Sequence, residues 1–231
     1  MSTTIREIPF EAQARAKSSR MCGAAALCMV FRSLGIHASQ HDLWEQIARR
    51  DRKGTRAART YLLAANALQH DLSALVVRAS DPWRTLRRCA AAGIRVILNH
   101  RLKADSPLGH FTVLLGVEGE TVILHDPQFG PERRFDRADL LKLWLPLPGG
   151  SEIAGNTLAA FSRPGPDPAT CAGCGTEVPP FIPCPGCRAP IPLRPHAVLG
   201  CLGEGCPERL WQRLFCPSCD RSLTQMFHPP A

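Results

Sequence analysis

No run of about 18 apolar residues occurs in this chain of 231 residues, so the sequence contains no candidate transmembrane helix. Its first residues, MSTTIREIPFEAQARAK, lack the apolar segment of a secretory signal. Aromatic residues are scarce, at 6% with a single Tyr, so no stacking surface for single-stranded nucleic acid is apparent. We therefore expect a cytoplasmic protein whose thiols stay reduced.

The tail of the chain has no net charge. Residues 165–231 contain five basic and five acidic residues, whereas residues 1–164 contain 23 Lys and Arg against 15 Asp and Glu. We expect the basic stretches ARRDRKGTRAAR (48–59) and WRTLRR (83–88) to be solvated helix faces. Nucleic acid is therefore not the expected partner. A protein that binds nucleic acid through a zinc ribbon in its tail is kept as the second alternative.

Periodic apolar residues in the front part predict helices first and a mainly antiparallel sheet afterwards. This order indicates an α+β fold. The Ser39 and Asp81 side chains are expected helix caps, and FTVLLGV and TVILHD are expected to form a hairpin. The predicted helices span 22–34, 40–50, 55–69, 82–92 and 137–145, and the predicted strands span 73–78, 94–98, 111–117, 121–126 and 157–162.

The Pro-rich segment SRPGPDPAT predicts a boundary between two domains. We expect a domain over residues 1–162, a linker over 163–170 and a second, small domain over 171–231. Within this tail, FIPCPGCRAPI and RLFCPSCDRSL align at an offset of 32 residues, which indicates an internal repeat.

Cysteine is sparse in the front part but dense in the tail, where eight of the eleven cysteines form four close pairs. Zinc prefers four tetrahedral ligands, and two tight turns with two thiolates each supply one site. The tail therefore resembles a double zinc ribbon with about two structural zinc ions. Sequential pairing of the turns is the simplest arrangement, and interleaved pairing is the alternative. The expected ligands are Cys171, Cys174, Cys184, Cys187, Cys201, Cys206, Cys216 and Cys219.

A cysteine in the front part has the setting of a nucleophile. Cys22 stands at the expected N-terminus of an Ala-rich helix, where free N–H groups and the helix dipole stabilise a thiolate. His110 begins one strand of the predicted hairpin and Asp126 ends the other, so the two side chains are expected to be cross-strand neighbours. These residues predict a Cys-His-Asp triad.

Other cysteines and histidines compete for these roles. Cys28 and Cys89 lie within apolar helices and are expected core residues. His125 alternates to the opposite sheet face from Asp126, and His100 precedes a loop. We therefore favour His110 as the base.

The segments CGAAALCMVFRSLG and GHFTVLLGVEGETVILHDPQFGP, with their order in the chain, resemble the papain-like cysteine peptidases that remove double-glycine leader peptides from bacteriocins. The resemblance covers residues 5–162. It implies a papain-like fold, with Cys22 as nucleophile, His110 as base and Asp126 as the residue that orients the imidazole. It also implies a peptide or protein substrate, and the zinc ribbon implies a partner protein.

The chain departs from this family at the oxyanion hole. The family usually has a Gln six residues before the cysteine, where this chain has Ala16, and often an Asp just before it, where this chain has Met21. Gln13, three residues out of register, is the weak substitute. We expect a cysteine peptidase that hydrolyses a peptide or amide bond. The first alternative is an inactive peptide-binding adaptor with the same fold.

Overall fold

The computed structural model describes residues 2–4, 7–16, 19–50, 54–106, 108–145, 155–166 and 168–224. Nine strands of these residues form one sheet in the order β10-β9-β8-β7-β11-β6-β14-β15, with β1 paired to β8 and every pair antiparallel. The strands are β1 (Ser2–Thr4), β6 (Ser73–Ala79), β7 (Arg95–Arg101), β8 (Gly109–Glu118), β9 (Thr121–Asp126), β10 (Gly130–Asp136), β11 (Thr157–Ser162), β14 (Trp211–Phe215) and β15 (Ser222–Leu223).

Three short hairpins lie outside this sheet, and six helices occur among the described residues. The hairpins are β2 (Arg15–Ala16) with β3 (Ser19–Arg20), β4 (Ala48–Arg50) with β5 (Arg56–Ala58), and β12 (Phe181–Pro183) with β13 (Pro190–Pro192). The helices are α1 (Cys22–Ser33), α2 (Gln40–Ile47), α3 (Thr60–Leu68), α4 (Pro82–Ala91), α5 (Arg137–Trp144) and α6 (His196–Leu199). The α+β prediction is confirmed. None of these helices has the length and apolar composition needed to cross a bilayer.

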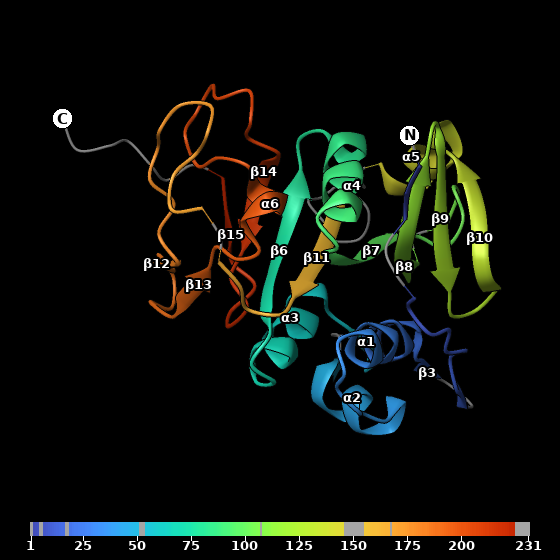
Figure 1. Cartoon of the computed structure of the whole chain (residues 1–231). Coiled ribbons are helices and arrows are strands. Elements are labelled where there is room, and N and C mark those ends of the chain that lie inside the picture. Colours follow the sequence, from blue (N-terminus) through green and yellow to red (C-terminus); the bar gives the residue numbers. More distant parts are fainter. Residues whose placement is uncertain are drawn as a thin grey trace.

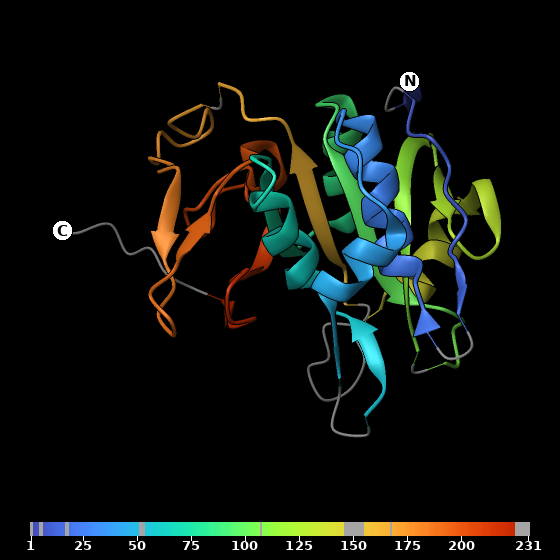
Figure 2. The ribbon, with the colours of Figure 1, turned by 90° about the horizontal axis from the view of Figure 1, so that it is seen from below.

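The helices α1, α2 and α3 gather into one group that packs against the sheet, α1 on β8 and α3 on β6 and β11 (Figures 1 and 2). Ten consecutive residues of α1 are buried, and its many alanines allow close approach to the sheet. A Cβ added at Gly23 would lie 2.8 Å from the Ala58 Cβ and 3.2 Å from the Phe111 ring. The N-terminus of α1 is therefore fixed between the β4–β5 hairpin and β8.

The predicted caps are present. The Ser39 hydroxyl accepts a hydrogen bond from the Asp42 N–H, and the Asp81 carboxylate accepts one from the Arg84 N–H with Pro82 as the first helical residue. The helix predicted to begin near Thr55 instead begins at Thr60, because Arg56–Ala58 pairs with β4 and packs on α1. This is a case in which tertiary contacts outweigh helix propensity.

The cysteine-rich tail joins the main sheet. Strand β14 runs antiparallel beside β6, with Leu214 opposite Val77 and Phe215 opposite Val76. Buried side chains of the tail, among them Val178 and Ile191, belong to one hydrophobic core with those of the front part. The division of the chain into residues 1–162, 163–170 and 171–231 stays a prediction. The front part and the tail share one sheet and one hydrophobic core.

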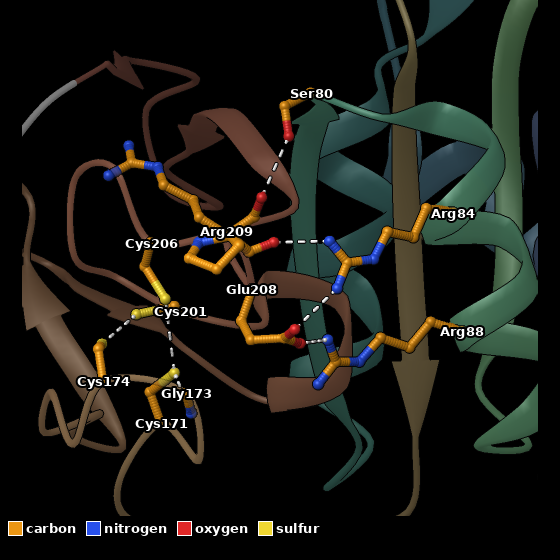
Figure 3. A network of polar contacts seen from close by, with 11 residues as sticks. Ser80, Arg84, Arg88, Cys171, Gly173, Cys174, Cys201, Cys206, Glu208 and Arg209 are labelled. Atoms are coloured by element: carbon orange, nitrogen blue, oxygen red, sulfur yellow. Dashed lines mark hydrogen bonds and ion pairs between the residues drawn. The ribbon is translucent and has the colours of Figure 1, made fainter.

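A polar network also joins the tail to α4 (Figure 3). The Glu208 carboxylate accepts hydrogen bonds from Arg84 at 2.8 Å and from Arg88 at 2.7 Å, and Arg84 also donates to the Pro207 carbonyl. Gly200 lies beside this network at φ +71°, and a Cβ there would lie 1.8 Å from the Glu208 carbonyl oxygen. A side chain at position 200 would therefore push this segment away from its place against α4.

Candidate functional site

His110 and Asp126 form a buried pair at one end of the β8–β9 hairpin. The His110 Nε2 and the Asp126 Oδ1 are 2.8 Å apart, and the side chains are only 2% and 3% exposed. The same Asp126 oxygen accepts hydrogen bonds from the backbone N–H groups of Gln128 at 2.9 Å and Phe129 at 3.1 Å. Three donors therefore hold this carboxylate oxygen in place.

The contact between His110 and Asp126 is diagonal across the hairpin. Val113 pairs with His125 and Leu114 with Leu124, and a bulge between Leu114 and Gly116 shifts the register by one residue toward the turn. This register places His110 two residues beyond the position opposite Asp126, and a diagonal pair of this kind remains within side-chain reach. The expectation of directly opposed residues was therefore inexact, because Glu118 pairs with Thr121 and the turn lies closer to Asp126 than expected. The bulge reduces this offset by one residue and places His110 and Asp126 on the same face of the sheet.

Cys22 is the first residue of α1 and is 5% exposed. Its thiol lies close enough to the His110 ring to contribute to the raised pKa of that imidazole. Because Nε2 of that ring faces Asp126, Nδ1 is the nitrogen left for the sulfur. The fold therefore brings Cys22, His110 and Asp126 together from the start of a helix and two strands.

Charge in this site is arranged as an ion pair. Burial lowers the pKa of His110, but hydrogen bonds and charge interactions with Asp126 and Cys22 outweigh it and raise that pKa to about 9. Burial acts to raise the pKa of Asp126, yet the His110 contact and the two backbone N–H groups hold it below its usual value. At neutral pH the site thus contains an imidazolium and a carboxylate.

The two competing histidines have other contacts. The His125 Nε2 donates to the Ile8 carbonyl at 2.8 Å, and its Nδ1 accepts from the Glu132 N–H at 3.2 Å. His100 lies directly across the sheet from His110, with ring centroids 5.6 Å apart, and burial lowers its pKa to about 4. A neutral, buried His100 adds no positive charge beside the imidazolium of His110.

The two other front cysteines are core residues in the structure. The Cys28 thiol donates to the Ala38 carbonyl at 3.0 Å, and burial raises its pKa. Cys89 is fully buried, which raises its pKa to about 12. Neither thiol has a histidine partner among the described residues, so both lack the setting that Cys22 has.

Gln13 reaches the edge of the same site. Its backbone N–H donates to the Pro127 carbonyl at 2.9 Å, next to Asp126. The amide oxygen of its side chain is buried and has no hydrogen-bond partner among the described residues. Ala16 and Ser19 pair in the short β2–β3 hairpin, which lies between Gln13 and Cys22 in the chain.

The eight tail cysteines form two interleaved tetrads. Within each tetrad the four sulfur atoms lie within 4.8 Å of one another. Sequential pairing, the simpler expectation, is not what the structure has. The repeat at an offset of 32 residues is the sequence signal for the observed pairing, since its two aligned turns share one tetrad. The first tetrad is Cys171, Cys174, Cys201 and Cys206, and the second is Cys184, Cys187, Cys216 and Cys219.

The geometry of the tetrads suits a metal ion. Sulfur–sulfur contacts between turns measure 3.4 and 3.8 Å in the first tetrad and 3.7 Å twice in the second. A disulfide needs about 2.05 Å, whereas four sulfurs at about 2.3 Å from a tetrahedral zinc lie about 3.8 Å apart. Backbone N–H groups of Gly173, Gly186, Gly203 and Ser218 donate to cysteine sulfurs at 3.2 to 3.4 Å, as expected for thiolates held in tight turns.

A model of the Peptidase C39 family matches residues 10–146, which include Cys22, His110 and Asp126. The chain belongs to the Peptidase C39 family. An uncharacterized protein from Methanothermobacter marburgensis is 36% identical to it over 118 residues, which are 50% of this chain and 71% of that protein. The family and the observed architecture together show a papain-like cysteine peptidase fold.

Two solved peptidase structures resemble this chain. A C39-like peptidase candidate from Bacillus anthracis superposes with a TM-score of 0.57 at 15% identity, covering 72% of this chain and all of that one. The peptidase domain of Streptococcus ComA, a bi-functional ABC transporter, superposes with a TM-score of 0.50 at 14% identity, covering 68% of this chain and all of that domain. At these identities the likeness concerns the fold alone.

Proposed function

We propose that this protein is a cysteine peptidase that hydrolyses a peptide or amide bond through Cys22, His110 and Asp126. The observation that supports this most is the buried contact between His110 and Asp126 at 2.8 Å beside a thiol at the start of α1. A nucleophilic thiol needs a base, and the base needs an orienting group, in this arrangement. Membership of a peptidase family supports the same reaction class.

In this mechanism the Cys22 thiolate attacks the carbonyl carbon of the substrate and forms a C–S bond. His110 then gives its proton to the departing nitrogen as the C–N bond breaks, which leaves a thioester. A water molecule, deprotonated by His110, attacks the thioester and releases the carboxylic acid and the thiol. Asp126 keeps the imidazole oriented and stabilises its charge through both steps.

The developing oxyanion needs hydrogen-bond donors, and we assign this role to the Cys22 backbone N–H and to the Gln13 side chain. Ala16, which occupies the family's usual Gln position, has no donor on its side chain. The β2–β3 hairpin offers a reason for the offset, because its extra residues lie between Gln13 and Cys22 while Gln13 remains bonded to Pro127. The donor in this assignment is the NH2 group of Gln13, since the amide oxygen of that side chain can only accept.

We further propose that each tetrad holds one structural zinc ion, about two in total. Four thiolates per site leave no open coordination position, so the metal would stabilise the tail and take no part in hydrolysis. Reduced thiols in this number also favour a cytoplasmic location. A peptide or protein is the expected substrate, and a partner protein is the expected ligand of the zinc ribbon.

Digestion of a proteome-derived peptide library tests the proposed activity across many candidate substrates at once. Cleaved peptides identified by mass spectrometry should appear with the natural chain and disappear with Cys22→Ser, whereas Cys28→Ser should retain cleavage. Gln13→Ala should slow cleavage on the order of a hundredfold. Absence of cleavage by the natural chain, together with tight binding of peptides, would instead support the adaptor with the same fold.

A further inference from the structure

The segment that contains Cys22 also contains most of the excess positive charge of the protein. Residues 13–59 include ten Lys and Arg against three Asp and Glu, while the whole chain has a net charge of +8. The sequence predicted a solvated helix face for much of this charge. In the structure part of it belongs instead to the β4–β5 hairpin, which extends away from the rest of the molecule in Figure 2.

One face of this hairpin is directed toward the N-terminus of α1. Ala48 pairs with Ala58, and Ala58 packs against Gly23, the residue after the nucleophile. Arg50 pairs with Arg56 on the same face, two residues or about 7 Å further along the strands. Two arginines therefore lie on the hairpin face that packs on the start of α1, further toward the tip of the hairpin than the contact with Gly23.

Only one of these two arginines is neutralised. Arg56 forms an ion pair with Glu45 at 2.8 Å and covers the Trp44 ring. The Arg50 guanidinium donates to the Gly54 carbonyl at 3.0 Å, and none of the described carboxylates forms an ion pair with it. Like charges directly opposite in an antiparallel pair are destabilising, so this position favours a further anion.

A third arginine lies on the other side of the site. Arg133 pairs with Leu124 in the sheet, so it shares the sheet face of Asp126, two residues further along β9. Its guanidinium lies 5.8 Å from the Phe129 ring, and that ring lies 6.1 Å from the His110 ring. Arg133 is exposed and has no ion-pair partner among the described residues.

We propose that Arg50 and Arg133 recognise acidic side chains on the two sides of the scissile bond, so that the substrate is an acidic polypeptide segment. This inference rests on the proposed peptidase function, because Arg50 belongs to the hairpin that packs on the start of α1 and Arg133 contacts the Phe129 ring beside His110. The half-exposed Phe129 ring between Arg133 and His110 would contact the substrate backbone or an apolar side chain. Two separate cations around a reactive centre fit carboxylates on an extended peptide better than a continuous row of phosphates.

Each proposed residue has a natural control beside it. Arg49 adjoins Arg50 on the opposite face of β4, where it bonds to the carbonyls of Gln46 and Ala48. Arg134 adjoins Arg133 on the opposite face of β10, where it pairs with Glu118 at 2.6 Å. A Gln substitution at any of the four arginines removes one positive charge. Differences in peptide binding between the four variants therefore reflect the position of the charge and not the net charge of the protein.

The test uses a Gly-Gly peptide flanked by glutamates and has two readouts. The first is the affinity of the peptide for the Cys22→Ser chain, and the second is the protection of Cys22 in the natural chain from iodoacetamide. The glutamate peptide should bind about tenfold more tightly than its glutamine counterpart, and added salt should reduce the difference. Arg50→Gln and Arg133→Gln should each remove much of this preference, and Arg49→Gln and Arg134→Gln should retain it.

Equal binding of the two peptides, or equal losses in all four variants, would overturn the inference. Equal protection by a single-stranded oligonucleotide of the same charge would also overturn it, since the site would then select any polyanion. Because binding to Cys22→Ser requires no catalysis, selective binding without library cleavage by the natural chain would contradict the proposed peptidase alone.

Discussion

Cysteine occurs in two kinds of environment in this molecule, and the neighbouring groups differ between them. Cys22 begins a helix and contacts a single histidine, which in turn contacts a buried carboxylate. Each tail cysteine instead lies with three other sulfurs within 4.8 Å of its own. The first environment is the kind that we propose for a nucleophile, whereas the second suits a metal ion.

The comparison also concerns stability. The Cys22 site is built on a hydrophobic core that includes the tightly packed α1 and the sheet. The tetrads lie among turns with few regular elements, and the tail reaches the core through β14. The chemistry of the front cysteine therefore depends on geometry, and the folding of the tail should depend on metal.

Removal of metal from the tail should change the stability of the protein more than any other change considered. Chelation should lower the free energy of unfolding by at least several kcal/mol, since structural zinc contributes about 10–16 kcal/mol in zinc-finger peptides. Since β14 pairs with β6, amide hydrogen exchange should increase in both strands. The predicted boundary at the Pro-rich segment would instead confine the loss to residues 171–219.

A matched pair of variants sharpens this test. Cys216 and Cys89 are both fully buried, but only Cys216 belongs to a tetrad. Cys216→Ser should reproduce the effect of chelation and reduce the zinc content measured by elemental analysis, whereas Cys89→Ser should leave the zinc content unchanged. A zinc-free protein with protected β14 and β6 amides would contradict the assignment.

A change of pH should affect the front site with a smaller amplitude. The pKa of His110 is about 9 in the folded chain and about 6.5 in an unfolded one, so folding favours its protonated form. The stability from this group is complete below about pH 6.5 and disappears as the pH rises through about 9, with an upper limit of about 3 kcal/mol. Denaturant titrations across this range should show the loss.

His110→Gln should flatten this part of the pH profile. His37→Gln, at an exposed histidine remote from the site in sequence, should preserve it. A natural chain whose stability is constant from pH 6.5 to 9 would show that His110 is neutral in the folded state.

Loss of the ion pairs between the tail and α4 should have the smallest effect on stability. Glu208→Gln removes the charge that pairs with Arg84 and Arg88, which are partly exposed to solvent. Exposed ion pairs contribute little, so the Tm should fall by at most about 4 °C and library cleavage should persist. Glu204→Gln, an exposed neighbour, is the control. A loss of cleavage with Glu208→Gln would mean that the tail regulates the front site.

Much of the front part could be predicted from local signals. Ser39, Asp81 and the alternating apolar residues of β8 and β9 determine their elements through short-range capping and burial. The β4–β5 hairpin and β10 were not predicted, because their residues lack apolar periodicity and depend on partners distant in the sequence. The same holds for β14, whose place beside β6 depends on tertiary packing.

The candidate site was predictable in its residues but not in its geometry. A helix start and a hairpin were enough to select Cys22, His110 and Asp126. The bulge near Leu115 and the exact diagonal contact follow from packing that the sequence does not express locally. The expected ligands were likewise all found in tetrads, whereas their interleaving requires the three-dimensional path of the tail.

Site-resolved alkylation tests the role of Cys22 most directly. Iodoacetamide should label Cys22 at mildly acidic pH, where an ordinary thiol is protonated. Cys28 and Cys89 should remain unmodified, because both are completely buried and burial raises the pKa of each thiol. His110→Ala should move Cys22 labelling toward alkaline pH, and Asp126→Asn should move it less. Labelling of Cys22 at the rate of an ordinary thiol, unchanged by His110→Ala, would contradict the triad.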